Sequence, residues 1–123
     1  MVKHAGFTLI ELLVVMAVLA TLLVLVAPRY HTSVERSREA VLKENLFQLR
    51  EAIGKYHADK GHYPETLETL AEERYLRRVP IDPITDSDRT WVVVPPADSL
   101  TGIWDVRSGA QGRSSKGTEF AAW

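Results

Sequence analysis

Cysteine is absent from this 123-residue chain, which excludes disulfide bridges and thiolate metal sites. An excess of charge of one sign is missing as well, because 15 lysines and arginines stand against 16 aspartates and glutamates. A chain without a basic excess has little with which to hold phosphate backbones, so we expect no nucleic-acid partner. The lack of cysteine does not identify the compartment, which must be inferred from the front of the chain.

Long hydrophobic runs are lacking everywhere except near the N terminus. Every side chain from Leu12 to Ala27 is apolar except Thr21, whereas the sequence from Arg29 onward mixes both charges. A helix over residues 7–27 would span about 31 Å, close to the roughly 30 Å hydrocarbon core of a bilayer. The sequence therefore predicts a membrane-spanning segment followed by a soluble part.

A cleaved secretory signal is the main alternative for the apolar run, with Lys3 as its short basic start. The end of the run argues against it, because Ala27 is followed by Pro28 and the small residues lack A-x-A spacing. Another candidate cut lies ahead of the run, where the small residue Gly6 meets the aromatic Phe7.

The residues around this candidate cut form a specific motif, GFTLIELLVV at positions 6–15. It resembles the N-terminal motif of type IV pilins and type II secretion pseudopilins. In that family a prepilin peptidase cuts after the glycine, here Gly6, and methylates the new terminal amine, here that of Phe7. The resemblance also places the family's glutamate at Glu11 and its helix-breaking proline at Pro28.

The resemblance implies a division of the chain and a location. Residues 1–6 would be the leader, 7–28 the transmembrane and filament-core helix, 29–60 its amphipathic continuation, and 61–123 a small globular part. The protein would cross the bacterial inner membrane once, with a cytoplasmic N terminus and a periplasmic globular part. Arg29, Arg36 and Arg38 follow the span, whereas only Lys3 precedes it, so the positive-inside rule disfavours this orientation. That rule is weakest when one flank is so short and the other a whole domain.

An acidic residue within an apolar span costs a few kcal/mol, so Glu11 needs an explanation. One alternative is that its side chain only reaches back to the lipid headgroups. The other is a charge partner, since cleavage would make the amine of Phe7 a cation that Glu11 of a neighbouring subunit neutralises. The resemblance assigns Glu11 and Pro28 to assembly of a helical homo-oligomer.

Beyond Pro28 apolar residues recur at helical spacing, which predicts that one helix, interrupted at Pro28, continues to Lys60. Gly61 suits the left-handed conformation that ends helices. The expected apolar positions are Val34, Val41, Leu42, Leu46, Leu49, Ile53 and Tyr56.

The remaining elements are expected to be short. A second helix is predicted within residues 67–75, and strands are predicted at Trp91–Val94 and Ile103–Val106 with a hairpin loop of residues 95–102 between them. The predicted fold is therefore α+β and type IV pilin-like, with a long N-terminal helix packed on a small antiparallel sheet.

Two further motifs favour type II secretion over the other branches of the family. GHYP at residues 61–64 and YLRRVPIDP at residues 75–83 resemble elements of pseudopilins, closest to the major, G-type subunit. Its expected partners are the prepilin peptidase, other pseudopilins and inner-membrane secretion components. A type IV pilus subunit remains the alternative, although the cysteine pair common in pilins is missing. A membrane-anchored enzyme or binding domain has little room for a pocket.

The resemblance also raises the question of calcium, which major pseudopilins bind in a C-terminal loop. Calcium needs six to eight oxygen ligands, yet residues 107–117 contain no acid, and only Asp105 and Glu119 flank them. The cations of this loop are Arg107, Arg113 and Lys116. We expect no cofactor, with Asp105 or Glu119 pairing with one of these cations instead; the alternative is that the chain is not the major subunit. Phe120 and Trp123 are expected to pin the tail back.

Three sets of side chains have the potential for chemistry: His31, His57 and His62; Ser108, Ser114 and Ser115; Asp82, Asp86 and Asp88. No two of these histidines have the i, i+4 spacing of helical metal ligands, and the serines lie in no G-x-S-x-G elbow. The aspartates stand near prolines, where turn formation explains them. We therefore expect no metal site and no catalytic activity.

Overall fold

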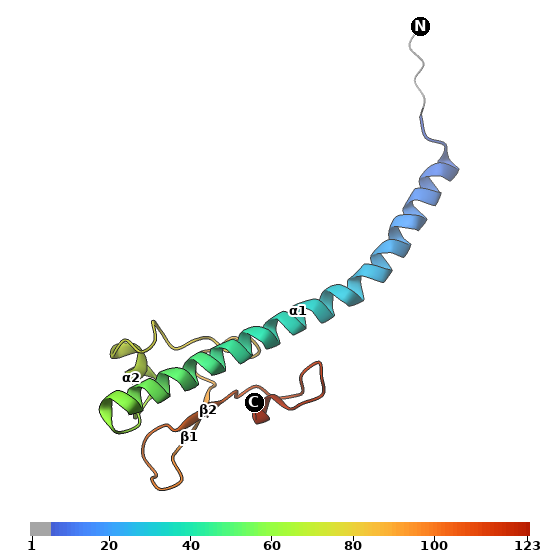
Figure 1. Cartoon of the computed structure of the whole chain (residues 1–123). Coiled ribbons are helices and arrows are strands. Elements are labelled where there is room, and N and C mark those ends of the chain that lie inside the picture. The colour runs from blue at the N-terminus through green and yellow to red at the C-terminus, as the bar shows by residue number, and fades with distance from the viewer. Residues whose placement is uncertain (1–5) are drawn as a thin grey trace. The chain divides into compact units, whose positions relative to one another are not determined.

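The computed structural model describes residues 6–123, so residues 1–5 of the expected leader lie outside the described part. The elements follow in the order α1 (Leu9–Lys60), α2 (Leu67–Glu72), β1 (Val92–Val94), β2 (Asp105–Arg107) and the 3₁₀ turn η1 (Phe120–Ala122) (Figure 1). The strands β1 and β2 form one antiparallel sheet. A long helix followed by a small antiparallel sheet confirms the expected α+β class.

The chain divides by its contacts into two units, residues 1–34 and residues 35–123. In the first unit α1 runs through Pro28 without ending, so the expected interruption is wrong as far as the helix itself is concerned. Proline removes the N–H donor that would bond Val24 O, yet the helix continues past it. One turn later Thr32 Oγ1 donates to Pro28 O at 3.1 Å. Thr21, the polar exception within the apolar run, likewise donates its hydroxyl to Ala17 O at 2.8 Å, which removes an unpaired donor from an apolar surface.

The apolar side chains of the first unit find no core within the described chain. All residues from 6 to 33 are exposed, and Phe7 is 86% exposed. By length and composition α1 contains a stretch that can cross a membrane. Such a surface requires lipid or other subunits around it, because exposing so much apolar area to water is unfavourable.

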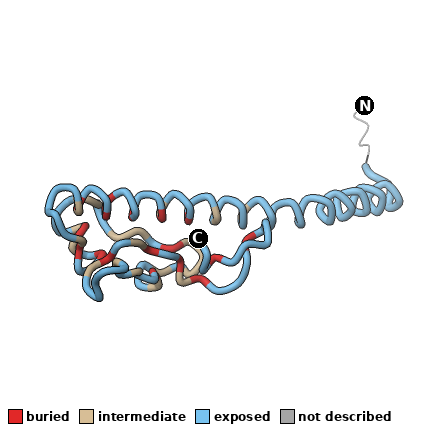
Figure 2. Tube along the Cα trace, turned by 60° about the horizontal axis from the view of Figure 1, so that its bottom comes forward, coloured by how far each residue is buried: buried red, intermediate tan, exposed pale blue. Residues whose placement is uncertain are grey.

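The second unit contains the core. One side of the rear half of α1 is buried, and Figure 2 shows these positions on a single side of the helix. The buried residues of α1 are Leu42, Leu46, Leu49, Ala52, Ile53 and Tyr56. The expected face is confirmed except at Val41, which is 49% exposed because it lies one step, about 100°, around the helix from Leu42. Val34 is only partly buried.

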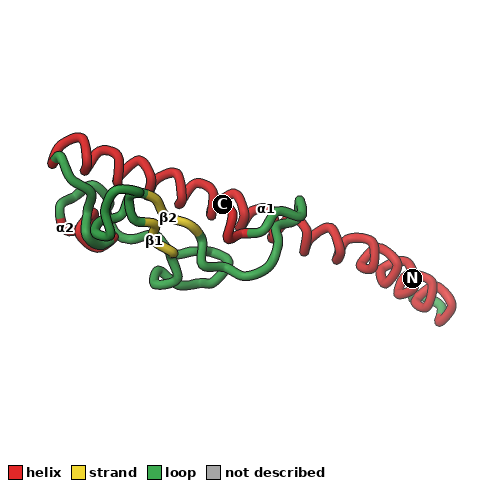
Figure 3. Tube along the Cα trace, turned by 90° about the horizontal axis from the view of Figure 1, so that it is seen from below, coloured by secondary structure: helices red, strands yellow, loops and turns green. Residues whose placement is uncertain are grey.

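Short elements and loops cover this face of α1, as Figure 3 shows. Their buried side chains are Leu67, Leu70, Trp91, Ile103, Val106, Ala110 and Phe120. The expected hairpin is confirmed, with Val93 opposite Val106, although its loop covers residues 95–104 instead of the predicted 95–102. Both strands begin later than predicted, because Trp91 and Ile103 are buried anchors just ahead of the ladder. Trp91 Nε1 donates to Pro80 O at 2.8 Å, and Ile103 N donates to Pro64 O at 2.8 Å.

The helix α2 is shorter than predicted. Thr66 caps its start by accepting a bond from Thr69 N at 3.2 Å. Its end is set by Arg74, whose φ of 66° is left-handed, while Tyr75 N donates to Leu70 O at 2.8 Å. Tyr75 therefore lies beyond the helix, and its hydroxyl donates to Asp59 Oδ2 at 2.8 Å.

Candidate functional site

The predicted cleavage position lies just ahead of α1. Gly6, Phe7 and Thr8 are non-helical and exposed, and the helix begins at Leu9. Among the described residues, a Cβ added at Gly6 would meet no atom within 4 Å apart from its chain neighbours. The bond between Gly6 and Phe7 is thus accessible without unwinding the helix.

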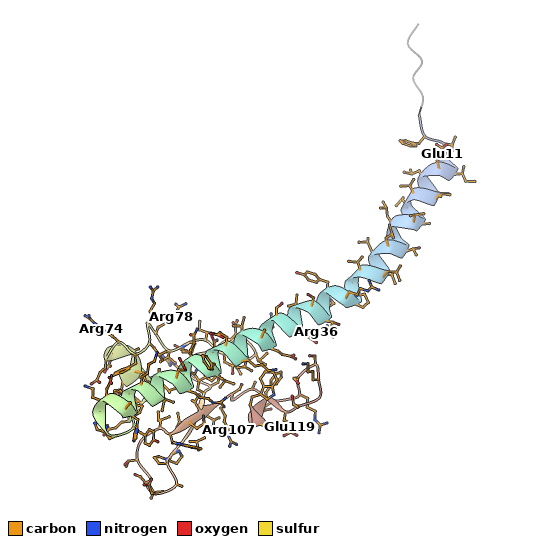
Figure 4. The ribbon with its side chains drawn as sticks, viewed as in Figure 1. Glu11, Arg36, Arg74, Arg78, Arg107 and Glu119 are labelled. Atoms are coloured by element: carbon orange, nitrogen blue, oxygen red, sulfur yellow. The ribbon has the colours of Figure 1, made fainter. Side chains whose placement is uncertain are left out.

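Glu11 lies in the first turn of α1 (Figure 4), where it takes part in a reciprocal cap that the sequence reasoning missed. Thr8 N donates to Glu11 Oε2 at 3.1 Å, and Glu11 N donates to Thr8 Oγ1 at 3.2 Å. Threonine followed three residues later by glutamate is the sequence signature of such a capping box. Both residues follow the predicted cut, so the cap belongs to the processed chain as well.

The carboxylate of Glu11 has no cationic partner in residues 6–123, where the ion pairs join other residues. Pro28 is not brought near it, because 1.5 Å of rise per residue puts the two roughly 25 Å apart along the helix. Glu11 and Pro28 are therefore separate features of one exposed apolar helix.

The C-terminal loop is attached to α1 by an acid far away in the sequence. Glu39 accepts two bonds from Ser115, from the backbone N at 2.6 Å and from Oγ at 2.7 Å. Partial burial by itself raises the pKa of the Glu39 carboxyl. The two bonds from Ser115 and the nearby Lys43 and Arg36 together outweigh it, so the pKa of Glu39 lies below its ordinary value. We call this contact the Glu39–Ser115 clamp. Nothing in the sequence pairs these two residues, since exposed glutamates and serines are common.

The rest of the loop is closed by its own hydrogen bonds. Ser114 N donates to Thr118 O at 2.7 Å, Gly117 N donates to Ser114 O at 2.9 Å, and Phe120 N donates to Gly112 O at 3.2 Å. These carbonyl oxygens already accept backbone bonds. The predicted aromatic anchor is confirmed for Phe120, which is buried, and the ring of Trp123 packs edge-on against it at 5.2 Å.

Of the two acids expected to pair with a cation of this loop, Glu119 does so and Asp105 does not. Arg113 Nη2 lies 3.8 Å from Glu119 Oε1, and Figure 4 shows Glu119 in the tail and Arg107 on the sheet. Asp105 pairs with Arg50 of α1 instead of a loop cation, at 2.8 Å. Arg50 also donates to Val106 O at 3.0 Å, so it joins α1 to β2.

Asp82 is a fully buried acid of the second unit. Its Oδ1 accepts bonds from Ile84 N at 2.8 Å and Thr85 N at 3.4 Å, and its Oδ2 accepts from Ser108 Oγ at 2.6 Å. The proposed role in a turn is confirmed, although the complete burial of Asp82 and its bond to Ser108 had no signal in the sequence.

The other side chains considered for chemistry take part in ring contacts and hydrogen bonds within the fold. His57 stacks on Tyr63 with ring centroids 4.1 Å apart, and His62 meets the edge of Tyr56 at 5.6 Å. The serines at 108, 114 and 115 are held in the bonds described above. Within residues 6–123 no group of three or more histidine, aspartate or glutamate side chains is placed to hold a metal ion.

The chain is similar to known proteins over nearly its whole length. Residues 1–27 match a family described as the prokaryotic N-terminal methylation motif. The chain is 29% identical to type II secretion system core protein G of Escherichia coli K12, over 98% of this chain and 92% of that protein. The protein of the same name from Pseudomonas aeruginosa is 30% identical, over 66% of this chain and 68% of the relative. That of Vibrio cholerae is 28% identical, over 98% and 92%. No solved structure matches.

Proposed function

Since this chain belongs to the family of type II secretion system core protein G, we propose a specific assembly role for its front end. The chain is a pseudopilin, a structural subunit of the secretion filament, and this reading is favoured over a type IV pilus subunit. Its relatives are structural proteins. The observation that carries the proposal is an apolar helix with no core of its own that begins with a single acid, Glu11.

The proposed sequence of events starts in the membrane. A prepilin peptidase cuts after Gly6 on the cytoplasmic face and methylates the amine of Phe7, while the globular part folds in the periplasm. The subunit is then taken from the inner membrane into a periplasmic filament through its front helix, in contact with other pseudopilins and inner-membrane secretion components. The accessible bond ahead of Leu9 and the match to the methylation motif support this order.

Within the filament, Glu11 is proposed to neutralise the Phe7 amine of an adjacent subunit. At about 4 Å and an effective dielectric near 20 such a pair attracts by roughly 4 kcal/mol, much of which desolvation cancels. The benefit is in register, because a subunit docked out of step would leave both charges unpaired in an apolar bundle. The cap on Thr8 uses one carboxylate oxygen of Glu11, Oε2, and leaves the other available.

The cap also shows how to separate charge from helix start. Glu11→Gln removes the charge yet can still accept a bond from Thr8 N, since glutamine also serves at this position of a capping box. Thr8→Val removes the capping hydroxyl and keeps the charge. We expect Glu11→Gln to abolish most filament assembly and Thr8→Val to preserve it.

The measurement is the yield of sheared filaments against total mature protein in membranes, with intact mass spectrometry to confirm that each chain begins at Phe7. Glu11→Leu should be inserted and cut like the parent. Assembly of Glu11→Gln at the parental level would refute the charge pair, and a mature chain that retains residues 1–6 would refute the processing step.

We also propose that the C-terminal loop is stable without calcium. Its polar groups do not fit that ion, because residues 107–117 supply no carboxylate and three cations, and the carbonyl oxygens of Gly112 and Ser114 accept backbone bonds. The Glu39–Ser115 clamp and the bonds within the loop hold it instead.

Thermal unfolding of the detergent-solubilised chain should be the same in millimolar calcium and in chelator. Calcium bound at a thousandfold excess over its dissociation constant would add about 4 kcal/mol, which shifts the midpoint by many degrees in a domain of this size. Such a shift would contradict the proposal. Glu39→Gln should increase amide exchange at Ser115 without conferring calcium dependence.

A further inference from the structure

The loop between β1 and β2 presents a leucine to solvent. Leu100 is 97% exposed, the most exposed large apolar side chain of the described chain. The loop around it has its own bonds: Ser99 N donates to Pro96 O at 3.3 Å, and Thr101 N donates to Ser99 Oγ at 3.2 Å. The leucine is therefore presented on a turn that is held by its own hydrogen bonds.

A groove on another surface of the second unit has the matching chemistry. It has a volume of about 380 Å³ and is lined by Lys43, Leu46, Phe47, Arg50 and Trp123. Its floor is apolar, and Phe47 is 57% exposed although it stands beside the buried Leu46. Its rim carries two cations, of which Lys43 lies over the Trp123 ring, 4.8 Å from the centroid.

The charges near the leucine complement those of the groove. Asp98 is exposed two residues before Leu100 and forms no ion pair within residues 6–123. At the groove, Arg50 is already engaged with Asp105, whereas Lys43, although near Glu39, forms no ion pair within the described residues. A loop that seats its leucine on an apolar floor and its carboxylate on a cationic rim satisfies both surfaces.

We propose that the loop of residues 95–102 of one subunit docks in the groove of a second copy of this chain, with Leu100 against Phe47 and Trp123 and with Asp98 near Lys43. Leu100 does not fill the groove of its own chain, because it is exposed there. Loop and groove are different surfaces, so each subunit donates one and accepts the other, and such a head-to-tail contact repeats into an open helical polymer. This inference rests on the proposed function, to which it adds a contact between globular parts.

Paired cysteines test the contact, since the parent chain contains none. Full-length Leu100→Cys/Phe47→Cys subunits are oxidised in cells that assemble the filament. Both positions are exposed in the monomer, so the substitutions should leave the fold intact. Disulfides require Cα atoms closer than about 7 Å, so adjacent subunits should give a ladder of dimers, trimers and larger products. The control pair Leu100→Cys/Glu68→Cys, with Glu68 exposed on α2, should give no ladder.

Two more arms make the result decisive. Co-expression of the two single variants should give dimers and nothing larger. Asp98→Lys and Lys43→Glu should each lower the filament yield about fivefold, and the double reversal should restore it. Filaments of the parent with no Leu100–Phe47 ladder, or a ladder equal to that of the control pair, would overturn the inference and leave the proposed function standing. Adducts formed only with a different protein would overturn it too. If the parent forms no filament, the proposed function itself fails.

Discussion

Replacing Asp82 by alanine should destabilise the folded part far more than the loss of a small side chain suggests. Asp82 is fully buried and accepts three hydrogen bonds, two of them short. A bond to a charged group is worth about 1.5–3 kcal/mol, and alanine would also leave the buried Ser108 hydroxyl and the Ile84 amide without their acceptor. The free energy of unfolding should therefore fall by about 3–5 kcal/mol.

Asparagine separates the two parts of this cost. Asp82→Asn keeps an oxygen for Ile84 N and offers an amide to Ser108, whose hydroxyl can turn to accept it. The expected loss is about 1–2 kcal/mol, which is the difference between charged and neutral bonds. The order of stability should thus be parent, Asp82→Asn, Asp82→Ala.

Tryptophan fluorescence of the detergent-solubilised chain in urea is the assay, because Trp91, Trp104 and Trp123 all lie in the second unit. With a slope of about 2 kcal/mol/M, a loss of about 3–5 kcal/mol lowers the urea midpoint by roughly 1.5–2.5 M. If Asp82→Ala and Asp82→Asn unfold at the same concentration as the parent, the buried bonds contribute nothing and the reasoning is wrong.

Two other outcomes are expected. Gly109→Ala should cost about 2–3 kcal/mol, since its Cβ would lie 1.9 Å from Thr90 O. Gly54→Ala within α1 should stabilise by about 0.5–1 kcal/mol, since its Cβ meets nothing within 4 Å. A urea midpoint equal to that of the parent would contradict either prediction. The hydrogen bond to Asp59 raises the pKa of Tyr75 to about 12 from its ordinary value of 10.0, so its stabilising effect is present below pH 10 and is lost as the pH rises towards 12. Absorbance at alkaline pH should show a late phase that Tyr75→Phe removes, and its persistence in that variant would refute the assignment.

The long helix was predictable because its signals are local. The recurrence of apolar residues placed the core face of α1, and Gly61, with a φ of 78°, ends the helix where the sequence suggested. The end of α2 was missed because Arg74 takes the left-handed position that usually belongs to glycine. The predicted strands began too early, because a buried aromatic anchor such as Trp91 is also a residue type that strands favour.

The contacts that hold the globular part together had no such signals. The Glu39–Ser115 clamp joins residues 76 positions apart, and the Arg50–Asp105 pair joins residues 55 positions apart. Each partner is an ordinary surface residue type, and only the tertiary fold decides which of many acids meets which donor. The cap of Glu11 on Thr8 is different, because its spacing is a local pattern that can be recognised in the sequence.

The exposed apolar side chains of the front helix determine where a subunit can be stored before use. Moving such a segment into water exposes more than a dozen large apolar groups at about 1.5–3 kcal/mol each, so escape into the aqueous phase is negligible. Exchange then takes place between polymer and bilayer alone. Elongation responds to the number of monomers per unit area of membrane, and a growing fibre depletes a two-dimensional pool that a shrinking one refills.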